Sequence, residues 1–392
     1  MNYILFDDNN RANLLPFTFT RPVADIRIGI LTIREKWELL LKEKTSTKTE
    51  SYLSKKFPLK SDTDNVWING AICPTEQLVK EITDLKSNHV LVLSDHVIAC
   101  NTADTKDFNY NEISTFEKIV SRSQLFQIEN VWDIFSKNEA AIKADFNLIT
   151  KGRKSQPIST TNQVIKPENI FIEEGAKVEC SILNASSGPI YIGKDAEIME
   201  GSIIRGSFAL CEHSTLKLGA KIYGPTTIGP HSKVGGEVNN SIIFGFSNKA
   251  HDGFLGNSVI GEWCNIGADS NNSNLKNNYA QVKLWNYNKE RFVNTGLTFC
   301  GLMMGDHSKC GINTMFNTGT VIGVNANIFG AGFPRNFVPS FSWGGAAGFT
   351  TYKLTDAFEV GSRVFERRGM VFNETEREIL THIFEATEKY RK

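Results

Sequence analysis

A large aliphatic residue recurs at every sixth position through the middle of the chain. This period is too long for the alternation of a β-strand and does not match the turn of an α-helix. It is typical of a coil with flat sides, in which each hexapeptide forms one side and its aliphatic residue points inward. Residues 166–340 are therefore predicted to form a left-handed parallel β-helix. The longest run is Ile192, Ile198, Ile204, Leu210, Leu216, Ile222, Ile228 and Val234.

The same period returns twice after interruptions. Residues 235–241 are predicted to lengthen one corner of the coil, and residues 269–303 leave the repeat as an extruded loop or hairpin. Small residues are expected at the corners, and glycine often follows the aliphatic residue, as at Gly193, Gly229 and Gly323. The later inward positions are predicted to be Ile242, Asn248, Phe254, Ile260, Ile266, Met304, Cys310, Phe316, Ile322 and Ile328.

The two flanking regions differ from the repeat. Residues 1–150 alternate short apolar runs with segments of helical periodicity, which predicts an α/β domain with a mostly parallel sheet. Residues 151–165 are polar and are expected to form a linker, and residues 341–392 are expected to form a helical tail. The predicted strands of the first region are 4–6, 66–68 and 90–93, its predicted helices are 30–44 and 75–85, and the predicted helices of the tail are 356–368 and 374–390.

The composition limits which binding partners and which cellular compartment are to be expected. The chain has 43 Lys and Arg against 43 Asp and Glu, which argues against a broad basic surface for nucleic acid. No apolar run approaches the roughly 20 residues that span a bilayer, and the N-terminus lacks the basic flank of a signal peptide. Seven cysteines without a C-x-x-C pair suit a reducing cytoplasm. We therefore expect a cytoplasmic protein that binds small molecules and neither nucleic acid nor membrane.

The most informative polar stretch lies where the repeat slips, at residues 248–256, so its side chains need not point inward. His251 lies there beside Lys249 and precedes an Asn-rich loop. This combination suits acyl transfer, because an attacking amine must lose a proton and imidazole, with an ordinary pKa of about 6.5, is a suitable base. Asparagine amides and backbone N–H groups suit the oxyanion. Lys249 or Lys283 suits a phosphate group as a point charge.

The other histidines of the repeat fit this chemistry less well. His213 and His231 lie in ordinary repeat units and are expected to be surface or structural residues. His307 and Lys309 lie next to the returning coils, and both are candidates to face the cofactor. A β-helix carbonic anhydrase needs histidines that converge on a metal between subunits. The spacing of His213, His231 and His251 would instead stack them along one face, which disfavours that alternative.

Residues 256–268 read GNSVIGEWCNIGA and, with Lys249-Ala250-His251 before them, resemble the acetyltransferase half of the bifunctional GlmU family. That family pairs a glucosamine-1-phosphate N-acetyltransferase with an N-acetylglucosamine-1-phosphate uridylyltransferase. Over its whole length the chain is most similar to a divergent GlmU-like group of the Bacteroidetes type, marked by LPFTFTRP at residues 15–22. The resemblance implies acetyl transfer from acetyl-CoA to an amino-sugar 1-phosphate, and a homotrimer whose active sites lie between subunits.

The resemblance also implies roles for single residues. His251 matches the catalytic base of the family. Asn265 and Asn274 match asparagines that line the acceptor site. Ala268 falls where a backbone group contacts the acetyl end of coenzyme A, and Lys283 matches a lysine near the active site of archaeal relatives.

The acetyltransferase region departs from the family at several positions. Phe254 stands where a tyrosine is expected, three residues after the histidine. The arginine and lysine that hold the sugar phosphate in the bacterial enzyme fall near Tyr223 and Ser241. Phosphate recognition must therefore use other groups, or the acceptor differs.

The N-terminal region departs further. Family nucleotidyltransferases hold nucleotide phosphates with a Gly-rich loop after the first strand, but residues 6–17 read FDDNNRANLLPF, without glycine and with Phe17 in place of a lysine. Two interpretations of this region are open. It either transfers a nucleotidyl group from UTP with Mg²⁺ to give a UDP-sugar, or it is a degenerate or purely structural domain. If the region is active, the expected phosphate ligands are Arg11, Arg21 and Arg27, and the expected Mg²⁺ ligands are Asp7, Asp8, Asp25 or Asp95.

Two classes of function remain open at this point. The first is an acetyltransferase, with or without nucleotidyl transfer, and it is favoured by His251 and Asn265. The second is a β-helix trimer that has lost catalysis and binds a sugar nucleotide for regulation, and it is favoured by Phe254 and the missing glycines. A nucleotidyltransferase for a different sugar 1-phosphate is a further alternative.

Overall fold

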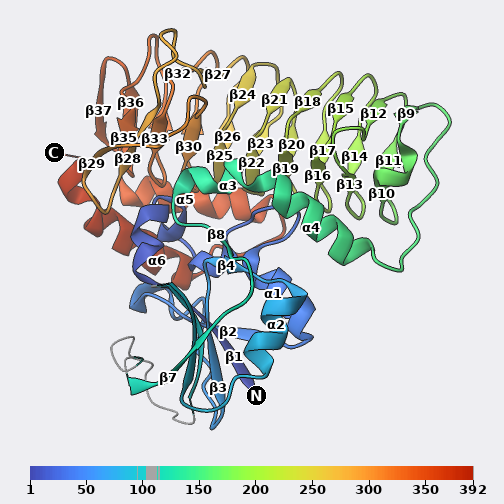
Figure 1. Cartoon of the computed structure of the whole chain (residues 1–392). Coiled ribbons are helices and arrows are strands. Elements are labelled where there is room, and N and C mark those ends of the chain that lie inside the picture. The colour runs from blue at the N-terminus through green and yellow to red at the C-terminus, as the bar shows by residue number, and fades with distance from the viewer. Residues whose placement is uncertain (95, 103–112, 114, 392) are drawn as a thin grey trace. The chain divides into compact units, whose positions relative to one another are not determined.

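The computed structural model describes residues 1–94, 96–102, 113 and 115–391. The chain divides into two compact units (Figure 1). Residues 130–150 and two short N-terminal segments belong to the unit that contains the repeat, whereas the sequence analysis assigned residues 1–150 to one domain. Unit 1 comprises Met1–Leu14, Thr20–Ile26 and Leu31–Glu129, and unit 2 comprises Leu15–Phe19, Arg27–Ile30 and Asn130–Lys392.

Unit 1 is the predicted α/β unit and contains a six-stranded sheet of order β2-β1-β3-β6-β5-β7. β1 is parallel to β2 and β3, and β5 is parallel to β7, but β6 is antiparallel to both neighbours. Five of the six strands therefore run in the same direction, as predicted for a mostly parallel sheet. Only β6 runs against them, because Leu93 and His96 pair directly, as in a hairpin of antiparallel strands. The strands are β1 (Asn2–Phe6), β2 (Thr45–Lys48), β3 (Asn65–Asn69), β5 (His89–Leu93), β6 (His96–Thr102) and β7 (Glu117–Val120).

The two predicted helices of unit 1 are present as α1 (Ile33–Leu41) and α2 (Glu76–Thr83). Thr32 begins α1 with a capping box, in which its hydroxyl accepts from the Glu35 N–H and the Glu35 carboxylate accepts from the Thr32 N–H. Aromatic side chains such as Phe6 and Trp67 fill the core beside the sheet. A short ladder of β4 (Ile72–Cys73) and β8 (Phe126–Gln127) completes the unit.

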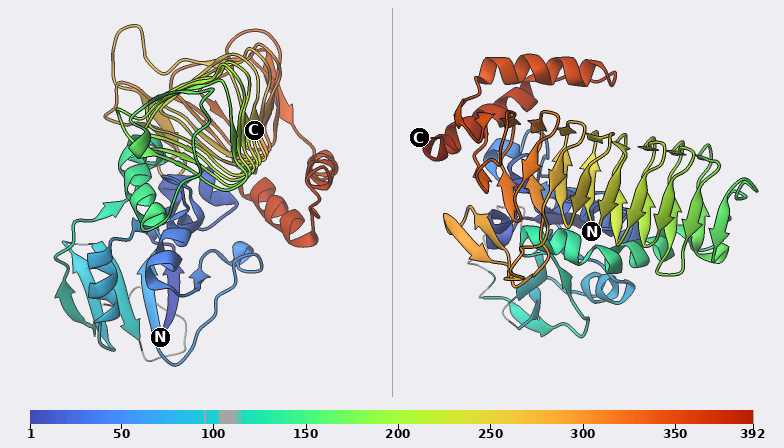
Figure 2. Two further views of the ribbon diagram at one scale, coloured as in Figure 1. Left: turned by 90° about the vertical axis from the view of Figure 1, so that its right-hand side faces the viewer. Right: turned by 90° about the horizontal axis from the view of Figure 1, so that it is seen from above.

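Unit 2 contains the predicted left-handed parallel β-helix, whose coils stack as a three-sided prism (Figure 2). Inward aliphatic side chains form one continuous column, from Ile170 to Val338. Burial of each such side chain contributes about 1.5–3 kcal/mol, which offsets the ordering of many short strands. Because every coil pairs in parallel with the next, the prism is a rigid base for the loops at its corners.

The three sides of the prism are three sheets. The first side consists of β10 (Ile170–Ile172), β13 (Ile190–Ile192), β16 (Phe208–Leu210), β19 (Thr226–Ile228), β22 (Ile242–Gly245), β25 (Val259–Glu262), β30 (Leu302–Met304), β33 (Thr320–Ile322) and β35 (Phe337–Val338). The second side consists of β11 (Lys177–Val178), β14 (Glu197–Ile198), β17 (Thr215–Leu216), β20 (Lys233–Val234), β23 (Asn248–Lys249), β26 (Asn265–Ile266), β31 (Lys309–Cys310), β34 (Asn327–Ile328), β36 (Ser342–Gly345) and β37 (Gly348–Thr351). The third side consists of β9 (Gln163–Ile165), β12 (Ile182–Asn184), β15 (Ile203–Arg205), β18 (Lys221–Tyr223), β21 (Glu237–Asn239) and β24 (Phe254–Gly256).

The phase of the later inward positions differs from the prediction. Val234 pairs with Lys249, and Val238 pairs with Leu255. The predicted lengthening of the corner at residues 235–241 was wrong, because only two residues separate β20 from β21, whereas four separate β17 from β18. Gly236, with φ of +71°, allows this tight corner. The inward residues that follow Val234 are therefore Val238, Ile243, Lys249 and Leu255, one position away from the predicted Ile242, Asn248 and Phe254.

Glycine follows many of the inward aliphatic residues because a side chain there would collide with the backbone of the next coil. The geometry of the corner does not require it. A Cβ on Gly229 would lie 1.6 Å from the backbone oxygen of Phe244 in the next coil. A Cβ on Gly323 would lie 2.3 Å from the backbone nitrogen of Ser340. Neither glycine has a positive φ. Close stacking of successive backbones therefore explains the recurrent glycine in the sequence.

The insertion at residues 269–303 first completes a coil and then leaves the prism. β27 (Asn271–Asn272) pairs in parallel with β32 (Met315–Phe316), so its first residues still follow the coil. An antiparallel hairpin of β28 (Lys283–Asn286) and β29 (Arg291–Asn294) follows, as predicted. The hairpin is held by Trp285, whose ring stacks on Phe337 with centroids 4.3 Å apart.

Four helices flank the prism of unit 2: α3 (Val131–Ser136), α4 (Asn138–Thr150), α5 (Leu354–Glu366) and α6 (Glu374–Ala386). Asn138 ties α4 to the N-terminal segment Arg27–Ile30, because its Oδ1 accepts a 2.8 Å hydrogen bond from the Gly29 N–H. The predicted tail helices correspond to α5 and α6, which lie beside the later coils (Figure 2). None of the helices in the described ranges is long and apolar enough to cross a membrane.

Candidate active site

His251 lies at a corner of the prism, in the turn between β23 and β24. Its side chain is exposed, so the imidazole is neither buried in the prism nor engaged in the column of aliphatic side chains. The turn is built around Gly253, whose φ of +114° and a close approach to the Ser270 carbonyl exclude a side chain. This position agrees with the expectation that the slip in the repeat releases His251 from the interior.

Lys249, predicted to contact a phosphate, instead points into the prism. Its register partner is Val234, and its side chain is 3% exposed. Its Nζ donates hydrogen bonds of 2.9 Å to the Gly235 carbonyl and 2.6 Å to the His251 carbonyl. Burial lowers the pKa of Lys249 from 10.5 to about 8, against the opposing effect of Asp252 and Asp269. Lys249 therefore positions the backbone of the turn that carries His251.

Substitution Lys249→Met should change the pH dependence of stability. Because the folded-state pKa of Lys249 lies below its ordinary value, the unfolded chain holds the extra proton between about pH 8 and 10.5, and stability rises with pH across this window. The wild type should gain up to about 3 kcal/mol in free energy of unfolding there. Urea unfolding at pH 7.5, 9 and 10.5 should show this rise in the wild type and in an exposed control, Lys221→Met, but not in Lys249→Met. An equal rise in all three would contradict the buried position of the ammonium group.

A hollow of about 610 Å³, here called the α5 pocket, opens beside His251 on the second side of the prism. Two further predicted residues, Asn265 and Lys309, line it. Residues that follow α5 close its other side, and none of its described lining residues is acidic. Its lining residues are Lys233, Phe246, Asn248, Ala250, His251, Trp263, Cys264, Asn265, Lys309, Val364, Arg367 and Arg368.

An aromatic ladder forms one wall of the α5 pocket. The ladder comprises corner residues of successive coils, all with positive φ: His213, His231, Phe246 and Trp263. Phe365 of α5 stacks on Trp263 with ring centroids 4.1 Å apart and so fixes the helix against the prism. His213 and His231 stack with centroids 4.9 Å apart, in line with their expected structural role.

Two of the predicted cofactor residues are partly enclosed. His307 is 6% exposed and lies next in the ladder, 6.4 Å from Trp263 between ring centroids. Lys309 lines the α5 pocket, and its Nζ donates a 2.8 Å hydrogen bond to the His307 carbonyl. Burial lowers the pKa of Lys309. Lys309 is therefore at the floor of the pocket, and His307 is a packing residue behind it.

A second hollow of about 540 Å³, the corner pocket, lies on the other side of the same turn. It is lined by His251, Asp252 and Ala268, among others. His251 is thus shared between the α5 pocket, with Asn265, and the corner pocket, with Ala268. An imidazole between two hollows can accept a proton from a group in one of them while a second reactant occupies the other.

Asn274 and Lys283 line neither hollow. Asn274 donates a 2.7 Å hydrogen bond to the side chain of Asn257, and Lys283 is exposed on the β28–β29 hairpin. The positions aligned with the usual phosphate ligands offer no cation. Tyr223 donates a 2.6 Å hydrogen bond to Glu237, and Ser241 is buried. In this chain, the cationic groups that share a hollow with His251 are Lys217 in the corner pocket and Lys233, Lys309, Arg367 and Arg368 in the α5 pocket.

Unit 1 has its own hollow of about 700 Å³, here called the strand-end pocket, after β1. Asp7, Asp8 and Arg11 line it. Asp7 accepts a 2.8 Å hydrogen bond from the Val23 N–H and lies 3.2 Å from Nε of Arg11. Burial raises the pKa of Asp7 to about 6, although Arg11 opposes the shift. Asp8 accepts hydrogen bonds of 2.9 Å from the Asn10 N–H and from Asn69.

The structure does not bring the three predicted arginines together. Arg11 lines the strand-end pocket, where Tyr52 accepts a 2.9 Å hydrogen bond from it. Arg21 is buried in unit 1, and Arg27 belongs to unit 2, where it contacts Cys211 and donates to the Ile30 carbonyl.

The predicted carboxylates that the structure describes, Asp7, Asp8 and Asp25, do not form a metal cluster either. Asp25 forms a 2.7 Å ion pair with Arg34, and Asp95 lies outside the described residues. Within the described ranges, no group of three or more His, Cys, Asp or Glu residues could hold a metal ion.

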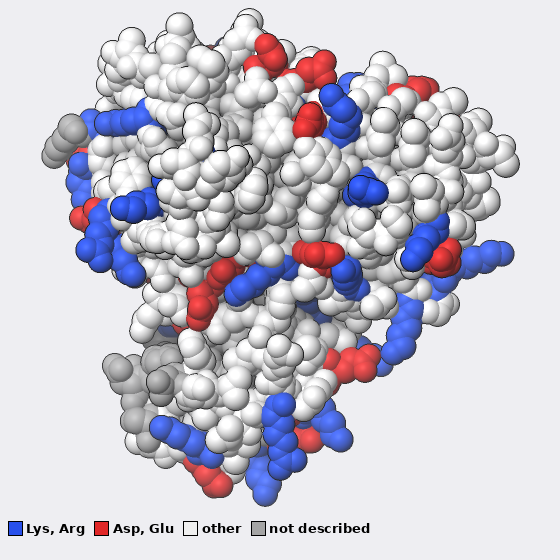
Figure 3. Space-filling view, turned by 45° about the horizontal axis from the view of Figure 1, so that its top comes forward, with Lys and Arg blue, Asp and Glu red and all other residues white. Residues whose placement is uncertain are grey.

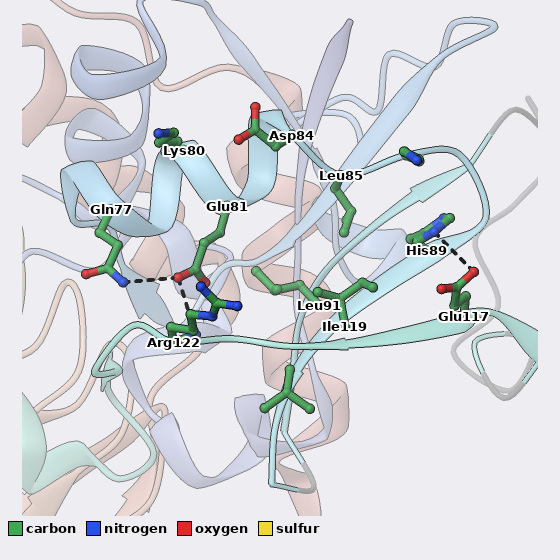
Figure 4. Close-up of a pocket in the computed structure, with 12 residues that line it drawn as sticks. Gln77, Lys80, Glu81, Asp84, Leu85, His89, Leu91, Glu117, Ile119 and Arg122 are labelled. Carbon is green, nitrogen blue, oxygen red and sulfur yellow. Dashed lines mark hydrogen bonds and ion pairs between the residues drawn. The ribbon is translucent and has the colours of Figure 1, made fainter.

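A further hollow of about 620 Å³ in unit 1 lies beside α2 and strands β5 and β7 (Figure 4). Glu81 lines this hollow and accepts hydrogen bonds from the Gln77 side chain and from the Arg122 backbone. None of the predicted site residues lines this hollow.

Parts of the chain are similar to known proteins. Residues 3–154 match the family model described as sugar nucleotidyl transferase. The bifunctional sugar-1-phosphate nucleotidylyltransferase/acetyltransferase of Sulfurisphaera tokodaii is 30% identical over 144 residues, which is 36% of this chain and 35% of that protein. The bifunctional protein GlmU of Methanocaldococcus jannaschii is 35% identical over 89 residues, which is 23% of this chain and 21% of that protein.

Over these stretches the chain resembles sugar nucleotidyl transferases and the bifunctional GlmU proteins. The aligned stretches span about a third or less of these relatives. The solved structure of a UDP-N-acetylglucosamine acyltransferase from Francisella novicida covers 59% of this chain and 87% of that chain, with 13% identity and a TM-score of 0.30. The Bacteroidetes type remains a prediction.

Sequence reasoning missed the part of the candidate site that follows α5. Arg367 and Arg368 were assigned only to a helical tail, because nothing in their local pattern points to His251, more than 100 residues earlier. Trp263 was quoted in the motif but given no role. A signal for the ladder existed, since a ring recurs once per coil at residues 213, 231, 246 and 263.

Proposed function

We propose that the chain is an acetyltransferase that transfers the acetyl group of acetyl-CoA to the amine of an amino-sugar 1-phosphate such as glucosamine-1-phosphate. The observation that supports this most directly is the exposed imidazole of His251 between the α5 pocket and the corner pocket. The identity with bifunctional nucleotidylyltransferase/acetyltransferases agrees with it.

In the proposed mechanism, His251 accepts a proton from the amine as the new C–N bond forms and the thioester C–S bond breaks. Asn265, in the same pocket, offers amide N–H groups to the acceptor or to the oxygen that becomes negatively charged. Ala268, in the other pocket, lies where the acetyl end of the thioester is expected. The departing sulfur receives a proton, so that free coenzyme A is released. Lys249 keeps the His251 backbone in place through the hydrogen bond to its carbonyl.

A homotrimer fits the surroundings of His251. Large apolar side chains are exposed at the same corner in other coils, including Leu218, Ile312 and Phe329. Uncharged side chains also occupy a broad area of the surface in Figure 3. These apolar side chains lie on both sides of the polar coils that carry His251, and their burial against another subunit would be favourable. We propose that a second copy covers this corner and completes the site, and that the protein acts in the cytoplasm.

The acetyltransferase proposal is tested by following thiol release from acetyl-CoA in the presence of glucosamine-1-phosphate. Release that depends on the sugar phosphate is the expected result. No release with this acceptor or with related amino-sugar 1-phosphates would favour a regulatory trimer that has lost catalysis.

We also propose that unit 1 transfers a nucleotidyl group from UTP to a sugar 1-phosphate. The match of residues 3–154 to sugar nucleotidyl transferases and the strand-end pocket support this. Mg²⁺ is commonly held by one or two carboxylates together with substrate phosphates, and Asp7 and Asp8 fit that pattern. The ion would neutralise phosphate charge. Asp8 is the more available ligand, because Arg11 already pairs with Asp7.

Substitution Asp8→Asn should weaken Mg²⁺-dependent UTP binding by about 10-fold or more, because it removes the carboxylate charge and keeps the side-chain size. Isothermal titration calorimetry with UTP, with and without Mg²⁺, measures this. The matched control is Asp84→Asn, an exposed carboxylate beside the other hollow of unit 1 (Figure 4). Equal UTP affinity in both variants would remove Asp8 from the proposed site.

A further inference from the structure

The cationic side chains of the α5 pocket have no acidic partners. The described residues provide neither a hydrogen bond nor an ion pair for the side chains of Lys233, Arg367 and Arg368. By contrast, Arg363 within α5 forms an ion pair with Glu359. Burial and the neighbouring Arg367 lower the pKa of Arg368, so these cations oppose one another in the absence of a ligand. An anion in the pocket would remove this repulsion.

The position of these cations is fixed by packing. Phe365 stacks on Trp263, and Trp263 stacks on Phe246 with centroids 4.3 Å apart. α5 ends at Glu366, so Arg367 and Arg368 follow directly at the rim of the pocket. Lys233 faces the same hollow from the prism. The three cations therefore come from two elements that the aromatic ladder holds together.

A second observation points to a ligand in the same hollow. The Oδ1 atom of Asn248 is buried and has no hydrogen-bond partner in the described part of the chain. A buried amide oxygen without a donor loses its hydrogen bond to water and gains none in return, so such groups usually have a partner. Asn248 lines the α5 pocket, so a rotation of its amide that turns Oδ1 toward the hollow would let a ligand N–H or O–H group donate to it.

We propose that Arg367, Arg368 and Lys233 form a clamp for a phosphate group, with Trp263 as its apolar wall and Asn248 as the acceptor for a neighbouring ligand N–H or O–H. This inference rests on the proposed acetyltransferase function. Arginine binds phosphate through two parallel N–H groups, and lysine adds a point charge. The phosphate belongs either to coenzyme A or to the amino-sugar 1-phosphate, since both substrates have one and both must lie near His251.

The test is binding to the full chain by isothermal titration calorimetry, which does not depend on turnover. The double variant Arg367→Ala/Arg368→Ala is compared with Arg363→Ala on the same helix. The ligands are coenzyme A, dephospho-coenzyme A, glucosamine-1-phosphate and glucosamine. We expect the double variant to lose about 10-fold to 100-fold in affinity for one phosphate-bearing ligand, and Arg363→Ala to retain it. The melting temperature of the unliganded protein should not fall, because neither arginine has a partner to lose and their mutual repulsion is removed.

The ligands distinguish the two sources of phosphate. A loss with glucosamine-1-phosphate but not with coenzyme A assigns the clamp to the acceptor, and the reverse assigns it to coenzyme A. An equal loss with dephospho-coenzyme A identifies the diphosphate rather than the 3′-phosphate. Unchanged affinity for all ligands would overturn the clamp even if acetyl transfer is observed. Arginine-dependent binding without any thiol release would support the clamp and reject the acetyltransferase.

Discussion

His251→Ala should lower kcat for acetyl transfer by about 10²-fold to 10⁴-fold, the usual contribution of a general base. The expected loss is in kcat rather than in stability, because the imidazole is exposed and makes no packing contact in the prism. The KM for acetyl-CoA should change much less, since the base acts on the amine. Steady-state thiol release with saturating glucosamine-1-phosphate measures both parameters.

Two further variants make this prediction specific. His251→Gln keeps a polar side chain of similar size but cannot accept a proton near neutral pH, so it should lose as much as the alanine variant. His213→Ala removes an imidazole from the ladder, away from both pockets, and should retain full activity. A wild-type kcat in His251→Gln would mean that another group accepts the proton.

Gly229→Ala should destabilise the β-helix by roughly 3 kcal/mol or more. The new Cβ would lie 1.6 Å from the Phe244 oxygen and 2.3 Å from its carbonyl carbon, so two adjacent coils must move apart. Gly229 also donates a 2.7 Å backbone hydrogen bond to Ile243 of that coil, which the movement would weaken. The expected fall in melting temperature is about 5–10 °C, followed by circular dichroism.

The matched control for this substitution is Gly311→Ala. Gly311 also follows an inward residue, but its nearest neighbour outside the adjacent residues would be the Cβ of Phe329, at an ordinary 3.5 Å. We expect a change within about 1 kcal/mol at this position. Similar losses at both glycines would show that backbone freedom, and not the stacking distance, sets the cost.

The fold was predictable because its signal is local and repeated. The inward column from Ile192 to Val234 follows directly from the sequence, as do α5 and α6. The phase error after Val234 has a physical origin, since a Gly-Gly corner can tighten as easily as it can lengthen. Antiparallel β6 was missed because strand direction depends on how the turn closes.

The candidate site was only partly predictable. His251, Asn265 and Ala268 are close in sequence and lie near one another because one coil follows the next. Lys249 could not be placed without the correct register, because one position decides whether a side chain points inward or outward. Arg367 and Arg368 depend on how a distant helix packs against Trp263, which no local pattern records.

Each coil of the β-helix stacks only on its nearest neighbours, which affects how the number of coils can change. The residues that surround the α5 pocket begin at Lys233, so the coils before β17 contribute none of them. Whole turns of the spiral could therefore be added or removed at that end without moving any group around the imidazole. The length of the scaffold and the chemistry of its corner are thus free to diverge separately.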